Sequence, residues 1–97
     1  MSIQRFLARQ MGKDIPYKLD NPPVPKATRR EYVVTPRKLV KDMLHADVRW
    51  SDYDRNDVPL GRITRVSLEL DISALTNPGE VIEAMCRKAD PNAFRGR

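Results

Sequence analysis

The sequence predicts an α+β fold in which a small C-terminal body follows a basic, proline-rich N-terminal segment. Two helix-start signals lie 42 residues apart, and one clear alternation of apolar and polar residues marks a strand between them. Charge divides the chain as well. Residues 1–41 hold ten Lys and Arg against three Asp and Glu, whereas residues 42–97 hold eight against ten. The net charge of +5 therefore belongs to the N-terminal part.

Residues 2–13 have the pattern of a short amphipathic helix capped by Ser2. Its apolar residues share one face: Ile3, Phe6, Leu7 and Met11. Its basic residues share the opposite face: Arg5, Arg9 and Lys13. Such a short helix is marginal alone and needs a surface, which its own domain, a partner or a membrane interface could supply. A basic amphipathic start is also typical of a mitochondrial targeting segment, but we expect a docked arm.

Residues 14–30 are predicted to be extended because they are rich in proline, which excludes helix and central strand. The prolines are Pro16, Pro22, Pro23 and Pro25. A chain near polyproline II could lie along a groove with Ile15, Tyr17, Leu19 and Val24 as contacts, or act only as a spacer. We therefore expect residues 1–30 to form an N-terminal arm and residues 31–97 a separate small α+β domain.

The domain begins with a β-prone run over residues 31–34 and a predicted helix over residues 35–44. Thr35 would cap this helix, and Pro36 would occupy its first position. Its apolar face would be Leu39, Val40, Met43 and Leu44. His45 would lie at the end of the helix, where the dipole favours a cation.

Two strands are predicted next, over residues 47–53 and 64–72, joined by a polar loop. Val48 and Trp50 would face inward on the first. On the second, the inward residues are Val66, Leu68, Leu70 and Ile72, and the outward residues are Arg65, Ser67, Glu69 and Asp71. The neighbouring strand would expose Arg49, Ser51 and Tyr53. With one aromatic residue and two acids across both strands, this face is a poor platform for stacking RNA bases.

A second helix is predicted over residues 77–89, because Asn77 can cap it and Pro78 suits its first position. Its buried stripe would be Val81, Ile82, Met85, Cys86 and Ala89. The resulting β-α-β-β-α order suggests a ferredoxin-like body or an incomplete one. Residues 92–97 could supply a last strand. If a partner supplied it instead, the open sheet edge would be a docking site.

The sequence contains no pattern that favours catalysis, a cofactor or a metal. His45 is the only histidine and Cys86 the only cysteine, and Cys86 is predicted to be a small core residue. Asp52, Asp54 and Asn56 match the first ligand positions of a calcium loop, but the required later glycine and glutamate are missing. We interpret residues 52–57 as a solvated acidic turn, which could receive arginines of the arm from the same chain or another copy.

These observations favour a non-enzymatic binding or assembly protein whose arm docks on an acidic protein or a larger complex. The predicted partner-binding residues are Arg5, Phe6, Leu7, Arg9, Lys13, Tyr17, Lys18, Arg29, Arg30, Arg37 and Lys38. Two alternatives stay open: arm contacts to nucleic-acid phosphates, and a virus-encoded regulator that binds a host protein. A homo-oligomer is compatible with the small core, and membrane attachment is a weak option. The single cysteine suggests a reducing intracellular compartment, with an organelle as a variant.

Overall fold

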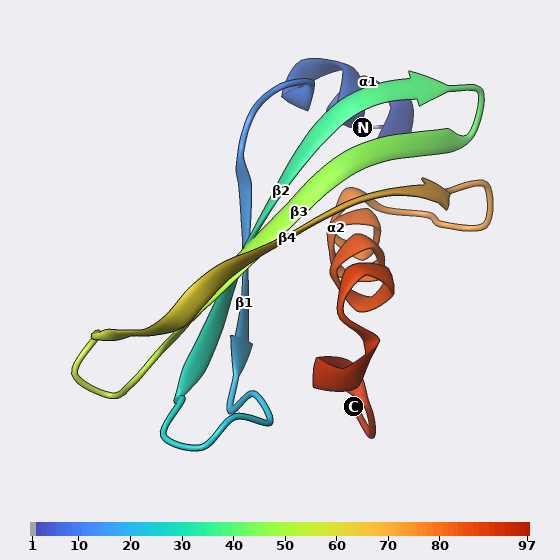
Figure 1. Cartoon of the computed structure of the whole chain (residues 1–97). Coiled ribbons are helices and arrows are strands. Elements are labelled where there is room, and N and C mark those ends of the chain that lie inside the picture. The colour runs from blue at the N-terminus through green and yellow to red at the C-terminus, as the bar shows by residue number, and fades with distance from the viewer. Residues whose placement is uncertain (1) are drawn as a thin grey trace.

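The computed structural model describes residues 2–97 and shows four antiparallel strands and two α-helices (Figure 1). In chain order the elements are α1 (Ile3–Gln10), β1 (Ile15–Asp20), β2 (Arg29–Val40), β3 (Met43–Tyr53), β4 (Pro59–Asp71), α2 (Pro78–Ala89) and the 3₁₀ turn η1 (Pro91–Phe94). The sheet order is β1-β2-β3-β4, so each strand pairs with its neighbour in sequence. The α+β class is confirmed.

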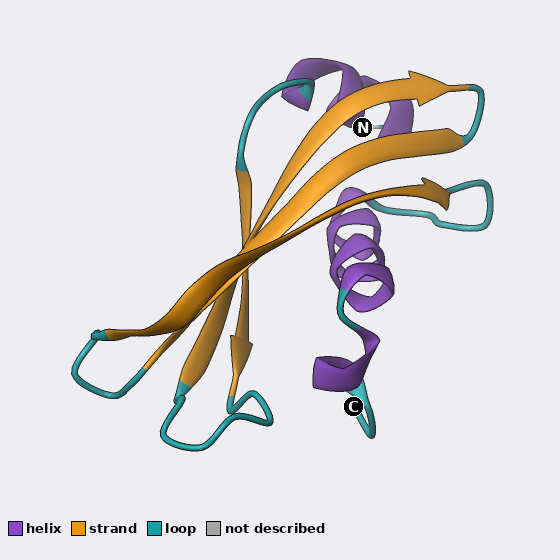
Figure 2. Ribbon diagram, viewed as in Figure 1, coloured by secondary structure: helices purple, strands orange, loops and turns teal. Residues whose placement is uncertain are grey.

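Both α-helices form where capping residues predicted them. Ser2 accepts a hydrogen bond from the Arg5 N–H (3.2 Å), and Asn77 accepts one from the Glu80 N–H (3.0 Å). The Glu80 carboxylate reaches back to the Thr76 N–H (3.2 Å), one residue before the cap. Figure 2 shows both helices on one side of a twisted sheet, where their apolar stripes join a single core.

The prediction of a helix over residues 35–44 is wrong. This segment forms the end of β2, the turn at residues 41–42 and the start of β3. Leu39 lies opposite Leu44 and Val40 opposite Met43, so a spacing that fits a helix face also fits a hairpin. Pro36, which has no backbone N–H, removes no hydrogen bond between β2 and β3. Its carbonyl faces away from β3 and accepts from the Gly12 N–H (2.7 Å), at a point where β1 has not yet begun.

Thr35 is buried and does not cap a helix. Its hydroxyl donates to Asp14 (2.8 Å), and the β-branched run before it extends the strand. The register shifts between Pro36 and Lys38, which places Arg37 at a bulge on the face opposite the helices.

The extended arm is not found in residues 3–20. Ile3 and Leu7 of α1 are buried in the core, and β1 pairs with β2 from Ile15 opposite Val34 to Asp20 opposite Arg29. Pro16 is tolerated because β1 is an edge strand, and the other three prolines fall in the β1–β2 connection. The strands and connections thus differ from the predicted β-α-β-β-α order.

Residues 92–97 do not form the predicted last strand. Pro91–Phe94 is a 3₁₀ turn that folds Phe94 into the core beside Tyr17 and Tyr32, with ring centroids 6.2 and 5.8 Å away. Tyr32 also lies 5.5 Å from Trp50, so aromatic residues fill the end of the core beneath α2.

The core lies between the helices and the inward face of the sheet. The inward residues of β2 and β3 are almost fully buried: Tyr32, Val34, Leu44, Ala46 and Val48. They pack on the α2 residues Val81, Ile82, Met85 and Cys86, and the predictions for this helix stripe are confirmed. Across residues 2–97, neither helix has the length and apolar content needed to cross a membrane.

Candidate functional site

The residues predicted to bind a partner divide into a set that the fold uses internally and a set that stays exposed. Leu7 is fully buried, and Phe6 packs against the core, so neither serves as an exposed anchor. The Tyr17 hydroxyl donates to Glu83 of α2 (2.9 Å), and burial raises the pKa of Tyr17. These three residues attach α1 and β1 to the body.

Arg30 is the centre of a buried charged network. Its Nε and Nη2 donate to the two carboxylate oxygens of Asp52 (2.6 and 2.9 Å), and its Nη1 donates to Asp90 (2.7 Å). The Tyr32 hydroxyl donates to the same Asp90 oxygen (2.7 Å), and burial raises the pKa of Tyr32. The hydrogen bond to Asp52 raises the pKa of Arg30. This network joins β2, β3 and the end of α2, and it leaves the Arg30 side chain only 10% exposed.

The arginine next to it, Arg29, is also neutralised, but nearer the surface. It contacts Glu31 (2.6 Å) and Asp57 (2.5 Å), and its guanidinium lies 4.6 Å from the centre of the Tyr53 ring. The expectation that the acidic turn receives arginines of residues 1–30 is confirmed within this chain. In the same turn, Asp54 accepts from the backbone N–H groups of Asn56 and Val58.

Two further predicted cations have partners on the exposed face of the sheet. Arg37 contacts Asp47 (2.6 Å), and Lys18 contacts Asp20 (3.7 Å). Each of these pairs is largely exposed and weakly held.

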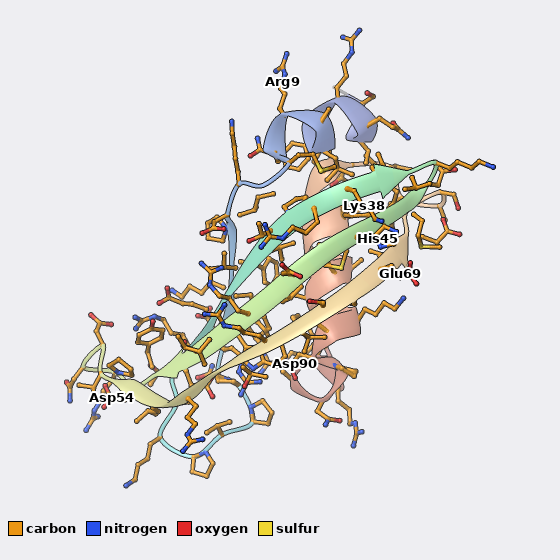
Figure 3. The ribbon with its side chains drawn as sticks, turned by 45° about the horizontal axis from the view of Figure 1, so that its top comes forward. Arg9, Lys38, His45, Asp54, Glu69 and Asp90 are labelled. Carbon is orange, nitrogen blue, oxygen red and sulfur yellow. The ribbon has the colours of Figure 1, made fainter. Side chains whose placement is uncertain are left out.

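Four predicted cations have no ion pair within residues 2–97: Arg5, Arg9, Lys13 and Lys38. The structure brings them to one end of the molecule, because the loop after α1 contacts β2 through the Gly12–Pro36 hydrogen bond. Figure 3 shows Arg9 projecting away from the body at the end where Lys38 lies. We name the exposed cations Arg5, Arg9, Lys13, Lys38 and Lys41 the α1–hairpin surface.

Lys41 was not among the predicted partner-binding residues, although Arg37 and Lys38 of the same predicted helix were. It occupies the β2–β3 turn, also without an ion pair in the described part of the chain. Two apolar side chains of the same hairpin are exposed beside it, Val40 at 54% and Met43 at 37%. The sequence signal would have been the charged pair Lys41-Asp42 between the apolar pairs Leu39-Val40 and Met43-Leu44, which fits a two-residue hairpin turn.

The acids next to these cations in the sequence form no ion pair with them within residues 2–97. Asp42 follows Lys41 in the β2–β3 turn and has no ion pair in the described part of the chain. Asp14 follows Lys13 but is engaged by the Thr35 hydroxyl and by Arg49 (3.0 Å), which together hold the pKa of Asp14 below its usual value. Residues 2–13 contain no Asp or Glu at all. Much of the chain's excess positive charge therefore lies unpaired at this end.

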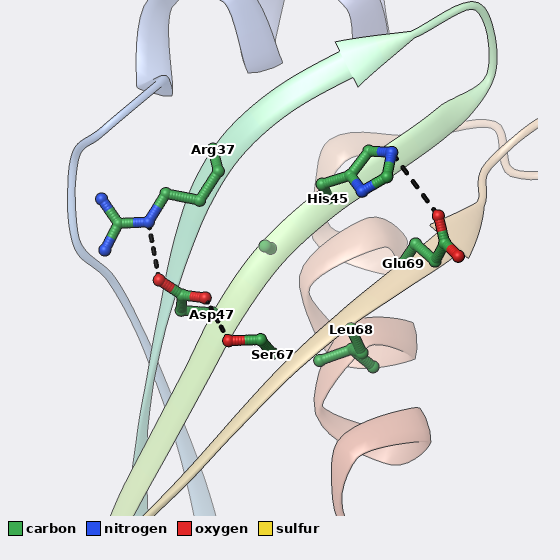
Figure 4. Close-up of a pocket in the computed structure, with 7 residues that line it drawn as sticks. Arg37, His45, Asp47, Ser67, Leu68 and Glu69 are labelled. Atoms are coloured by element: carbon green, nitrogen blue, oxygen red, sulfur yellow. Dashed lines mark hydrogen bonds and ion pairs between the residues drawn. The ribbon is translucent and has the colours of Figure 1, made fainter.

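The open face of the sheet carries a shallow hollow of about 310 Å³, shown in Figure 4. Asp47 accepts from Arg37 and from the Ser67 hydroxyl (2.7 Å), and these hydrogen bonds lower the pKa of Asp47. His45 does not end a helix as predicted; it lies on β3 with its Nε2 3.5 Å from the Glu69 carboxylate. The charged groups of the hollow thus satisfy one another.

No metal cluster of three His, Cys, Asp or Glu side chains occurs within residues 2–97. Cys86 of α2 is buried in the hydrophobic core, as predicted, and burial raises the pKa of its thiol to about 12. A thiol in this state is a packing group with little thiolate character.

No protein-family model, curated protein or solved structure matches this chain.

Proposed function

We propose that this chain is a non-enzymatic binding protein that contacts an acidic protein partner through the α1–hairpin surface. The observation that supports the proposal is a local excess of cations over acids. Arg5, Arg9, Lys13, Lys38 and Lys41 have no ion pair within residues 2–97, and residues 2–13 contain no Asp or Glu. At the other end of the sheet, Arg55 also has no ion pair in the described part of the chain, but Asp54 and Asp57 lie beside it. Clustered unpaired cations raise the rate and selectivity of association with an anionic surface.

A protein partner is favoured because exposed apolar groups accompany the charges. Val40 and Met43 lie opposite each other in the hairpin, and both are exposed. Val40 stands between Lys38 and Lys41 in the sequence. Protein interfaces combine an apolar centre, often with Met, and a polar rim. An acidic groove or acidic helix on a larger assembly would complement this arrangement.

The test neutralises the cations of α1 with the triple variant Arg5→Gln, Arg9→Gln and Lys13→Gln. The matched control removes the same charge elsewhere with Lys26→Gln in the β1–β2 connection, Arg55→Gln in the β3–β4 loop and Arg62→Gln in β4, all of them exposed. Binding of a fluorescein-labelled oligoglutamate peptide is measured by anisotropy at low salt. Each exposed ion pair contributes at most about 1 kcal/mol, so the first variant should lose about 2 kcal/mol, or about 30-fold in Kd.

The control should bind within a factor of about three of the unmodified protein, which corresponds to less than 1 kcal/mol. Equal losses in the two triple variants would show that only net charge matters and would refute a defined surface. Binding that survives neutralisation of α1 would refute the proposal outright.

Nucleic acid is a second candidate because residues 2–13, which include α1, carry three cations and no Asp or Glu. Arg5 and Arg9 are four residues apart, about 6 Å along a helix. If the α1–hairpin surface contacts about four phosphates of a duplex, log K should fall against log salt concentration with a slope of about −3.6. A preference for duplex DNA over oligoglutamate at equal salt, with that slope, would replace the protein-partner proposal.

A further inference from the structure

Strand β4 is an exposed edge whose inward side is incompletely covered. It is the outermost strand of the sheet (Figure 1). The inward residues of β2 and β3 are almost fully buried, but those of β4 are not: Val66, Leu68 and Leu70 are each half-buried, and Thr64 is exposed. Helix α2 therefore leaves an apolar row along β4. If another strand paired with this edge, its own inward-facing side chains would pack beside that row.

The free backbone groups of β4 belong to its odd-numbered residues. The Ile72 N–H donates to the Asp42 carbonyl beside β3 (2.9 Å), which directs the even-numbered residues toward β3. On the other side, Lys88 of α2 donates to the Glu69 carbonyl from outside the sheet. Arg65, Ser67 and Glu69 thus present their N–H and C=O groups to whatever lies beyond the edge.

We propose that a second copy of this chain pairs antiparallel with β4 around a two-fold axis at Ser67. This register places Arg65 opposite Glu69 of the second copy, twice, on the open face of the joined sheet. On the inward face it places Val66 opposite Leu68 of the second copy. Opposite charges and apolar groups in facing positions stabilise an antiparallel pair, and the symmetric interface is closed.

Neighbouring registers are less favourable because diagonal neighbours on one face also interact. Shifting the axis toward Val66 makes the two Arg65 side chains diagonal neighbours. Shifting it toward Leu68 does the same to the two Glu69 side chains. The Ser67 register alone among these three pairs Arg65 directly with Glu69 and keeps like charges apart.

The charged groups at this edge are available for such a contact. Arg65 is exposed and has no ion pair within residues 2–97. Glu69 faces His45 through one carboxylate oxygen at 3.5 Å and keeps its other oxygen free of any protein partner among the described residues. Lys88 occupies the Glu69 carbonyl in the single chain and must release it when a second strand arrives.

None of these residues belongs to the α1–hairpin surface, so the inference is independent of the proposed function. The test is a charge swap followed by sedimentation velocity from about 5 µM to 1 mM, a range that spans typical weak self-association. The unmodified chain should shift to twice the monomer mass as concentration rises. Arg65→Glu and Glu69→Arg should each weaken the dimer about tenfold or more, because each places like charges opposite one another.

The double variant R65E/E69R should restore dimerisation, because it rebuilds the facing pairs with signs exchanged. Lys88→Ala should strengthen the dimer, because the Glu69 carbonyl no longer has a competing donor. Arg55→Glu makes the same charge change away from the edge and should leave the dimer unaltered. A chain that stays monomeric to 1 mM, or a double variant no better than the single ones, overturns the proposal.

Discussion

The two adjacent arginines of β2 provide a direct test of how burial decides the value of an ion pair. Arg30 and Arg29 each contact two carboxylates at 2.5–2.7 Å. The partners of Arg30, Asp52 and Asp90, have side chains only 13% and 12% exposed, whereas those of Arg29, Glu31 and Asp57, are 46% and 77% exposed. The shortest contacts are therefore similar in length, but the burial differs, and Arg30 alone makes a second hydrogen bond to the same carboxylate, Asp52.

Arg30→Met keeps the length of the side chain and removes its charge, which leaves two mostly buried carboxylates without a cation. Removing one partner from a buried pair costs about 3–5 kcal/mol, and we expect the lower end because the network retains some solvent contact. Arg29→Met removes two largely exposed pairs and a cation–π contact that solvent screens, so its loss should be clearly smaller than the loss of about 3 kcal/mol expected for Arg30→Met.

Urea unfolding followed by far-UV circular dichroism and by the fluorescence of Trp50 measures both losses. With a denaturant slope of about 1.3 kcal/mol/M for a chain of this size, Arg30→Met should lower the midpoint by about 2 M and Arg29→Met by clearly less. The measurement belongs at low micromolar concentration, where self-association does not contribute. Equal losses for the two variants would refute the argument that burial sets the difference.

Three further outcomes are expected. Cys86 should react with a disulfide reagent at pH 8 only as fast as the chain unfolds, since burial raises its pKa to about 12; rapid reaction of the native protein would contradict this. Asp47 has a lowered pKa in the folded chain, so its hydrogen bonds stabilise the fold above about pH 4, the pKa of Asp in the unfolded chain, and that stabilisation is lost as pH falls further. The stability difference between the unmodified chain and Asp47→Asn should therefore shrink below that pH in acid-series urea titrations. Lys26 adopts φ +71°, which glycine tolerates better than lysine, so Lys26→Gly should raise the free energy of unfolding in urea by about 0.5–1 kcal/mol. A destabilised variant would show that contacts of the Lys26 side chain contribute more than its backbone conformation costs.

Local signals in the sequence predict the two helices and the alternation of β4. Ser2 and Asn77 cap helices because their side-chain oxygens reach a backbone N–H three residues on, and this geometry needs no distant partner. The alternation from Arg65 to Ile72 assigned faces that the structure confirms, with Ile72 buried and Arg65 exposed.

Long-range pairing explains where the sequence prediction failed. Thr35-Pro36 and Asn77-Pro78 carry the same local start signal, but a β-branched run precedes Thr35, and β3 offers that run a facing strand. Tertiary context overrode the helical pattern at residues 35–44. The arm was misjudged for a related reason: the amphipathic helix needed a surface, and the surface is the chain's own core.

The candidate site was half predictable. The sequence predicted Arg5, Arg9, Lys13 and Lys38 as partner-binding cations, and the first three form a basic stripe opposite the apolar residues of the predicted helix. It could not distinguish them from Arg29 and Arg30, since apart from Glu31, which lies two residues from Arg29, their partners Asp57, Asp52 and Asp90 lie 22 to 60 residues away in the chain. Only the fold decides which cations are already satisfied.

The two proposed contacts can be separated because they use different elements. A dimer through β4 would carry two α1–hairpin surfaces, and a partner with repeated acidic sites would then bind with an avidity that one copy lacks. Arg65→Glu should weaken binding to a long oligoglutamate chain at concentrations where the unmodified protein is dimeric, yet leave binding to a short oligoglutamate peptide unchanged. Neutralising Arg5, Arg9 and Lys13 should weaken both and leave the sedimentation of the dimer unaltered. If Arg65→Glu weakened the short and long ligands equally, β4 itself would contact the acidic chain, and the division of roles between the two surfaces would be refuted.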